Sequence, residues 1–120
     1  MSLREIIAFL LLMPALASAA DSKHGREIVT SRQSGLCLLC HSGPFPEAPL
    51  QGNLAPSLAG VGSRMTADQI RHKLVEPGDS IMPSFSKIDG KRDVAPLFVG
   101  KPILTPAEID DVVAFLVELR

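Results

Sequence analysis

The sequence predicts an all-α domain, in which three or four helices are joined by long ordered loops. A C-terminal segment combines a helix start signal with a broad apolar stripe, and two earlier segments have shorter helical patterns. No alternating apolar run of strand length competes with these patterns. The 120 residues are enough for one domain.

The final helix has the clearest signal. Thr105 is the expected N-cap, Pro106 suits the first helical position, and Glu108 completes a capping box. The residues that follow form an apolar stripe at helical spacing: Ile109, Val112, Val113, Phe115, Leu116 and Leu119. We therefore expect this helix to cover much of the core.

Two shorter helices are expected upstream. Thr66 and Gln69 form a second capping-box pattern, and Pro77 ends that helix. Its apolar face consists of Ala67, Ile70 and Leu74. Residues 23–32 predict a short amphipathic helix, in which Gly25 would allow a close approach of Phe115.

Long loops separate these helices. Residues 44–64 hold four Pro and three Gly, so we expect loop and turn throughout. Residues 79–104 are expected to be mostly irregular, and a loop of that length in a small domain is usually functional.

The N-terminus has the pattern of a secretory leader. Arg4 gives a positive start, residues 6–16 are an apolar run, and Ala17 and Ala19 fit an A-x-A cleavage pattern before Asp21. The alternative is an uncleaved membrane anchor, but the run falls short of the about 20 apolar residues that span a bilayer.

We therefore expect cleavage near Ala19 to Asp21 and export to the periplasm. Residues 1–20 would be the signal peptide and residues 21–120 the mature domain. The mature part has 11 Lys and Arg against 12 Asp and Glu, which excludes the clustered basic surface typical of nucleic-acid binding. It has no Trp or Tyr and only four Phe, so a cofactor is expected to fill part of the core.

The stretch "CLLCH", residues 37–41, indicates what that cofactor is. A redox disulfide of the thioredoxin type needs a preceding strand, which the sequence lacks. A zinc site needs about four ligands, and only two further His are available. Covalent haem attachment needs two Cys and an adjacent His, which favours thioether bonds at Cys37 and Cys40 and iron ligation by His41.

The second iron ligand decides between electron transfer and an open reactive site. The candidates in the mature chain are His24, Met65, His72 and Met82. His24 would be a frayed terminal residue, His72 points away from the apolar face of its helix, and Met65 suits a packing role before the Thr66 cap.

Met82 is the favoured ligand. Pro83 forces the preceding residue into an extended conformation, so the Met82 sulfur can project from a loop toward a haem face. The alternative is a loop Met that fills a gap in the core. On the other side of the iron, a backbone carbonyl of the loop around Pro56 and Leu58 would accept the Nδ1 hydrogen of His41 and fix its ring.

These features resemble a class I cytochrome c: a CxxCH near the first helix, a Pro-Leu loop, a distal Met before Pro, and a C-terminal helix. A closer resemblance is to the SoxX family, the small monohaem subunits of the SoxAX cytochrome of sulfur oxidation. The stretches that carry it are "GLCLLCHSGPFP", "LAPSLAGVGSR", "SIMPSF" and "GKPILTPAEIDDVVAFLVEL".

The resemblance implies one covalent haem c per chain and a heterodimer with a SoxA-type haem subunit. Such a pair couples thiosulfate oxidatively to a cysteine of the SoxYZ carrier, with the sulfur chemistry at the partner's haem. This chain would take up the electrons and pass them to a downstream cytochrome or other acceptor. The alternatives are a free-standing electron shuttle, a gas- or peroxide-binding haem protein, and a cofactor-free disulfide domain.

Overall fold

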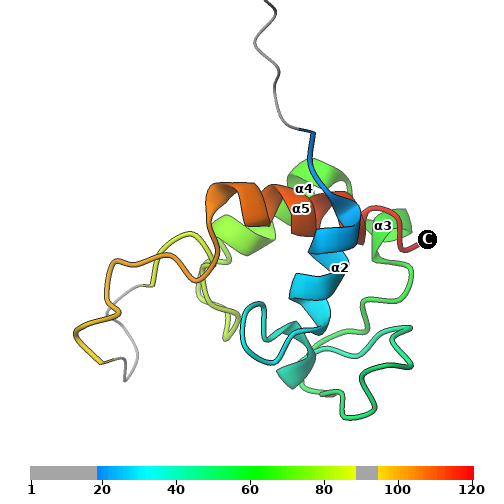
Figure 1. Cartoon of the computed structure of the whole chain (residues 1–120), viewed down its shortest axis with the longest axis horizontal. Coiled ribbons are helices and arrows are strands. Elements are labelled where there is room, and N and C mark those ends of the chain that lie inside the picture. Colours follow the sequence, from blue (N-terminus) through cyan, green and yellow to red (C-terminus); the bar gives the residue numbers. More distant parts are fainter. Residues whose placement is uncertain (1–18, 89–94) are drawn as a thin grey trace, which may run out of the picture.

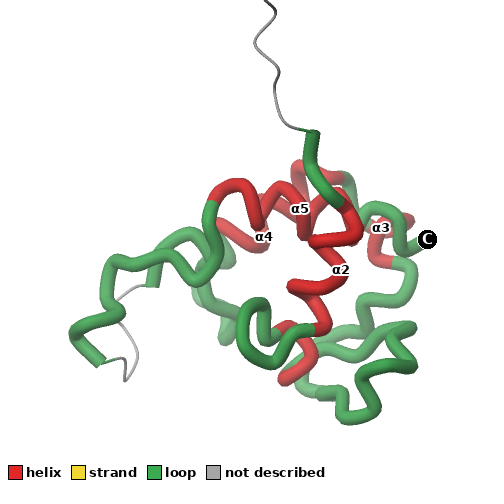
Figure 2. Tube along the Cα trace, in the orientation of Figure 1, coloured by secondary structure: helices red, strands yellow, loops and turns green. Residues whose placement is uncertain are grey.

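The computed structural model describes residues 19–88 and 95–120, and within them the chain is helical, with no strand. The elements in chain order are α2 (Ser22–Thr30), the 3-10 turn η1 (Cys37–Leu39), α3 (Val61–Arg64), α4 (Ala67–Val75) and α5 (Pro106–Leu116). Figures 1 and 2 show the helices together, with one long loop extending to the left of them and another below α2 and α3 at the lower right. The predicted signal peptide, apart from Ala19 and Ala20, lies outside the described residues. No helix in the described part is both long and apolar enough to cross a membrane.

Helix α5 begins as the sequence predicts. The Thr105 hydroxyl accepts from the Glu108 backbone N–H, and the Glu108 carboxylate accepts from the Thr105 N–H. The predicted stripe is buried at Ile109, Val112, Val113, Phe115 and Leu116, and Leu119 packs against the same core. The strong local start signal and the apolar period therefore agree.

Helices α2 and α5 cross closely, as the Gly25 hypothesis predicts. A Cβ added at Gly25 would lie 3.0 Å from Phe115 Cβ and closer still to the backbone of Asp111. Ile28 and Val29 are buried on the same side of α2. Only a residue without a side chain at position 25 lets the two backbones meet.

Helix α4 has the predicted capping box between Thr66 and Gln69. Ile70 and Leu74 are buried, but Ala67 is exposed, so the apolar face is narrower than predicted. Ala67 is the first residue of α4 and lies at the exposed end of the helix. Arg71 of α4 pairs with Asp110 of α5 at 2.6 Å.

The prediction of loop throughout residues 44–64 is wrong at α3. This short helix follows Gly60, whose φ of 71° is in the left-handed region that favours glycine. Arg64 donates to the carbonyls of Ala59 and Ser57, and Gly62 N–H donates to Leu119 O at 2.8 Å. Contacts with the C-terminal residues thus stabilise a helix that local composition does not predict.

The described parts of segment 79–104 are irregular, as predicted, while residues 89–94 lie outside the described residues. Ile88 N–H donates to Lys101 O, and Gly100 N–H donates to Ile88 O, both at 2.8 Å. At the base, the N–H groups of Ile103 and Leu104 donate to the carbonyl of Phe85, which is buried. Figure 1 shows this segment extending away from the helices.

Candidate functional site

The Cys motif forms one tight turn. Leu36 precedes it with a φ of 57°, which is uncommon for a residue with a side chain and ends the preceding loop sharply. His41 N–H then donates to Cys37 O at 2.9 Å, and Cys40 N–H donates to the same carbonyl at 3.3 Å. The turn brings Cys37, Cys40 and His41 together, and both thiols are free.

The His41 ring is fixed by the carbonyl that the sequence predicts. Its Nδ1 lies 2.6 Å from Pro56 O, so Nδ1–H donates and Nε2 keeps its lone pair. A neutral imidazole in this tautomer is the form that ligates iron, and the carbonyl raises its basicity as a ligand. The Nδ1 hypothesis is confirmed.

The segment that supplies this carbonyl is attached to the motif by its backbone. Three N–H groups donate to three carbonyls of the motif region at 2.7 to 3.0 Å: Gly52 to Leu38, Ala55 to Cys40, and Leu58 to Ser42. A Cβ added at Gly52 would overlap the carbonyl of Leu39, so this close approach requires glycine. The Pro56 carbonyl is therefore held in place by the bonds on both sides of it.

Gln51 was missed by the sequence analysis. Its Oε1 accepts from Gly43 N–H at 2.8 Å, and its Nε2 donates to Phe45 O at 2.9 Å and to Ala48 O at 2.8 Å. One half-buried side chain thus closes the loop that follows His41. A single Gln in a Pro-rich stretch gives no sequence signal for this role.

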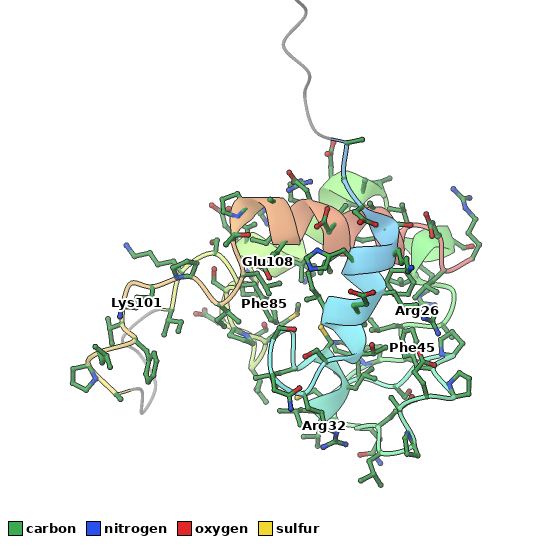
Figure 3. All side chains as sticks on the ribbon, in the orientation of Figure 1. Arg26, Arg32, Phe45, Phe85, Lys101 and Glu108 are labelled. Atoms are coloured by element: carbon green, nitrogen blue, oxygen red, sulfur yellow. The ribbon has the colours of Figure 1, made fainter. Side chains whose placement is uncertain are left out.

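A second set of contacts, centred on Arg26, joins that loop to α2. The Arg26 guanidinium lies 5.3 Å from the ring centroid of Phe45 and 5.7 Å from that of Phe115, and it pairs with Glu47 at 2.7 Å. Figure 3 shows Arg26 and Phe45 beside each other along α2. Phe45 is almost fully buried, so a loop residue contributes to the core between the first and last helices.

Burial raises the pKa of the Cys37 thiol to about 11, so the uncoordinated thiol keeps its proton at neutral pH. Within the described residues, no group of three or more His, Cys, Asp or Glu is arranged to hold a metal ion.

Met82 comes from a separate, non-helical segment. Its side chain is half-buried and packs against the same core as Cys37. It also borders a cavity of about 420 Å³, whose wall includes Val75, Ile88 and Ile103. No residue of the Cys motif lines this cavity, so it lies behind the Met82 loop rather than over the motif.

The other ligand candidates have other roles. His72 is exposed and lies 3.7 Å from Glu76, as its position on the helix predicts, and Met65 packs against the core beside Thr66. The expectation that His24 is a frayed terminal residue is wrong. It lies on α2 with Nδ1 2.7 Å from Asp111 Oδ2, a contact that joins residues 87 positions apart and leaves no local signal.

The residues present fit a covalently attached haem. Two free thiols and an imidazole with Nε2 uncommitted share one turn, and a thioether borders the same core. This set matches two thioether anchors and a His–Met ligand pair. A core with only three buried Phe is also consistent with a large flat cofactor as its remaining part.

Comparison with known proteins gives two findings. The family model described as cytochrome c matches residues 14–120. Among solved structures, one chain of the SoxXA crystal structure from P. pantotrophus is similar to this chain, with 34% sequence identity and a TM-score of 0.75. The match covers 86% of this chain and 84% of that chain. No curated protein matches the sequence.

Proposed function

The chain belongs to the cytochrome c family, and on this premise we propose that it is the SoxX-type subunit of a periplasmic SoxAX-type complex. It is a SoxX-like electron-transfer cytochrome with covalently bound haem c. In the proposed complex it accepts electrons while thiosulfate is coupled oxidatively to the cysteine of a SoxYZ-type carrier. The observation that carries the proposal is the 34% identity to a SoxXA chain over nearly the whole fold.

We assign the site residues as follows. Cys37 and Cys40 would form the two thioether bonds to the haem, and His41, through Nε2, and Met82 would ligate its iron. The haem supplies a one-electron ferric–ferrous couple. The protein's part is to keep the ligand geometry the same in both oxidation states. Two features support this role: the hydrogen bond from His41 to Pro56, and the backbone hydrogen bonds that join residues 52–58 to the Cys motif region.

The division of labour follows from this site. An iron ligated by both His41 and Met82 would leave no position for substrate, and the chain has no Cys besides Cys37 and Cys40 for sulfur transfer. The sulfur chemistry is therefore placed on the partner subunit. Exposed apolar side chains at Leu97, Phe98 and Val99 favour a protein that forms a complex over a free-standing shuttle.

Export completes the proposal. Residues 1–20 act as the signal peptide and residues 21–120 as the periplasmic domain, with haem attached after transport. The apolar run and the small residues before Asp21 support this division.

Co-purification from the native periplasm tests the proposed function. A tagged chain is expected to recover a second haem protein in a one-to-one ratio, and the pair is expected to consume thiosulfate only when a SoxYZ-type carrier is present. Recovery of the tagged chain as a monomer would favour the shuttle. A c-type absorption spectrum with a 1:1 ratio of haem to protein verifies the cofactor independently of the partner.

A further inference from the structure

The carboxylate of Asp111 holds the start of α2 with both of its oxygens. Oδ1 lies 2.7 Å from the backbone nitrogen of Asp21, and Oδ2 lies 2.7 Å from His24 Nδ1. The Asp111 side chain is only 15% exposed, while that of His24 is 45% exposed. A side chain of the last helix thus contacts the residue at which the mature chain is expected to begin.

Asp111 adds a second carboxylate at the N-terminus of α2. The first is that of the N-cap Asp21, which accepts from His24 N–H at 3.1 Å, and no acidic residue occupies the first turn of the helix. A helix N-terminus carries a partial positive charge, which a nearby carboxylate stabilises. Asp111 provides this carboxylate from α5.

We propose that the leader is removed at the bond between Ala20 and Asp21, and that the new α-ammonium of Asp21 forms an ion pair with Asp111. The inference rests on the proposed export. An endopeptidase that cuts after small residues adds water across this bond. Ala20 leaves with the leader as a carboxylate, and the freed amine of Asp21 takes up a proton.

The structure distinguishes two neighbouring cleavage positions. Ala17 and Ala19 suit cleavage after Ala19, whereas Ser18 and Ala20 suit cleavage after Ala20. Only the second places the new charge on the nitrogen that already donates to Asp111. Cleavage after Ala19 would put the ammonium on Ala20, which is exposed and precedes this contact.

Whether the new α-ammonium stabilises or destabilises the fold depends on Asp111. A positive charge at a helix N-terminus opposes the helix dipole and is unfavourable by itself. The Asp21 N–H already makes a charge-assisted bond to the Asp111 carboxylate, and cleavage adds a full positive charge to this donor, opposite a carboxylate that is only 15% exposed. The charged groups around the site are the Asp21 carboxylate, His24 and Glu27 on α2, and Asp111 on α5.

The first experiment determines the N-terminus of the exported protein by intact mass and N-terminal sequencing. The expected first residue is Asp21. A chain that begins at Ala20 would overturn the assignment of the cleaved bond. An uncut chain would instead overturn the proposed export, so the two failures are distinguishable.

The second experiment compares two haem-containing proteins made with defined starts, one at Asp21 and one with a Gly-Ser-Ala-Ala extension before it. The start at Asp21 is expected to lower the unfolding equilibrium constant at pH 6.5 by about three- to tenfold. In the Asp111→Asn background the advantage of the Asp21 start is expected to disappear, because the ammonium then faces the helix dipole with only the Asp21 carboxylate as counter-charge. Equal stability of the two parent proteins would refute the ion pair, whether or not the variant folds.

Asp110→Asn is the matched control. It removes the same charge from the adjacent position of α5, where the carboxylate pairs with Arg71 of α4 and does not touch α2. The advantage of the Asp21 start is expected to persist in this variant. Its loss would show that the net charge of α5, rather than the Asp111 contact, is responsible.

Discussion

The substitution Gly25→Ala tests how the two main helices meet. The added Cβ would lie 2.5 Å from the Asp111 carbonyl carbon and 3.0 Å from Phe115 Cβ, whereas ordinary contact begins at 3.4 Å. Relief of the first contact alone requires the helices to separate by about 0.9 Å. A gap of that size forfeits a quarter to a half of the dispersion energy between facing atoms, and it also lengthens the bonds from Asp111 to Asp21 and His24.

The change in stability that Gly25→Ala causes is the sum of two opposing contributions. Replacement of a helical Gly by Ala stabilises by about 1 kcal/mol through helix propensity, while overpacking and parted contacts destabilise by roughly 3 to 4 kcal/mol. We expect a net loss of about 2 to 3 kcal/mol, which lowers the Tm of a domain of this size by roughly 8 to 24 °C.

The assay is thermal unfolding of the haem-containing protein by far-UV circular dichroism, with Lys23→Ala as the control on the exposed face of the same helix. The control is expected to stay within about 0.5 kcal/mol of the parent. A Gly25→Ala protein as stable as the parent, or more stable, would refute the close approach of α2 and α5.

Three further predictions concern the site and its supports. Met82→Ala should let the reduced protein bind carbon monoxide and should lower its reduction potential, whereas Met65→Ala should do neither. The opposite pattern would identify Met65, rather than Met82, as the second iron ligand. The pKa of His24 is raised, and the largest cause is its hydrogen bond to Asp111. The stabilisation of the fold by this pair is therefore fully present below about pH 6.5 and is lost as the pH rises through the raised pKa. The Tm difference between the parent and His24→Gln should therefore be largest below about pH 6.5 and should shrink as the pH rises above it, and a constant difference would contradict the pairing. Gln51→Ala removes three hydrogen bonds and should destabilise by about 2 kcal/mol, with a Tm lower by roughly 8 to 16 °C; an unchanged Tm would mean that the loop does not need this side chain.

The helices were predictable because their signals are local. The capping boxes at Thr66 and Thr105 depend on residues three positions apart, and the α5 stripe has a helical period that the buried core reproduces. Helix α3 was not predictable, because its start at Gly60 and its contact with the C-terminal residues depend on tertiary structure. The contact of His24 was not predictable for the same reason, because its partner Asp111 is on another helix.

The motif was predictable as chemistry, and part of its support was predictable as geometry. The adjacent Cys, Cys and His predict haem attachment from spacing alone, and the rigid Pro56 loop predicts the carbonyl that orients His41. Gln51 and the contacts centred on Arg26 were not predictable, since each contact joins segments that share no period or motif.

The loop between the Cys motif and α3 can be rigid because much of its hydrogen bonding is made to the motif region. A small domain whose described residues hold three buried Phe and no strand has little core packing with which to fix such a loop. Backbone donors at Gly52, Ala55 and Leu58 reach the carbonyls of Leu38, Cys40 and Ser42, and Gln51 closes the turn that follows His41. An imidazole fixed in this way would need little rearrangement if the proposed iron ligand role of His41 is correct, because an electron-transfer site requires the same ligand geometry in both oxidation states.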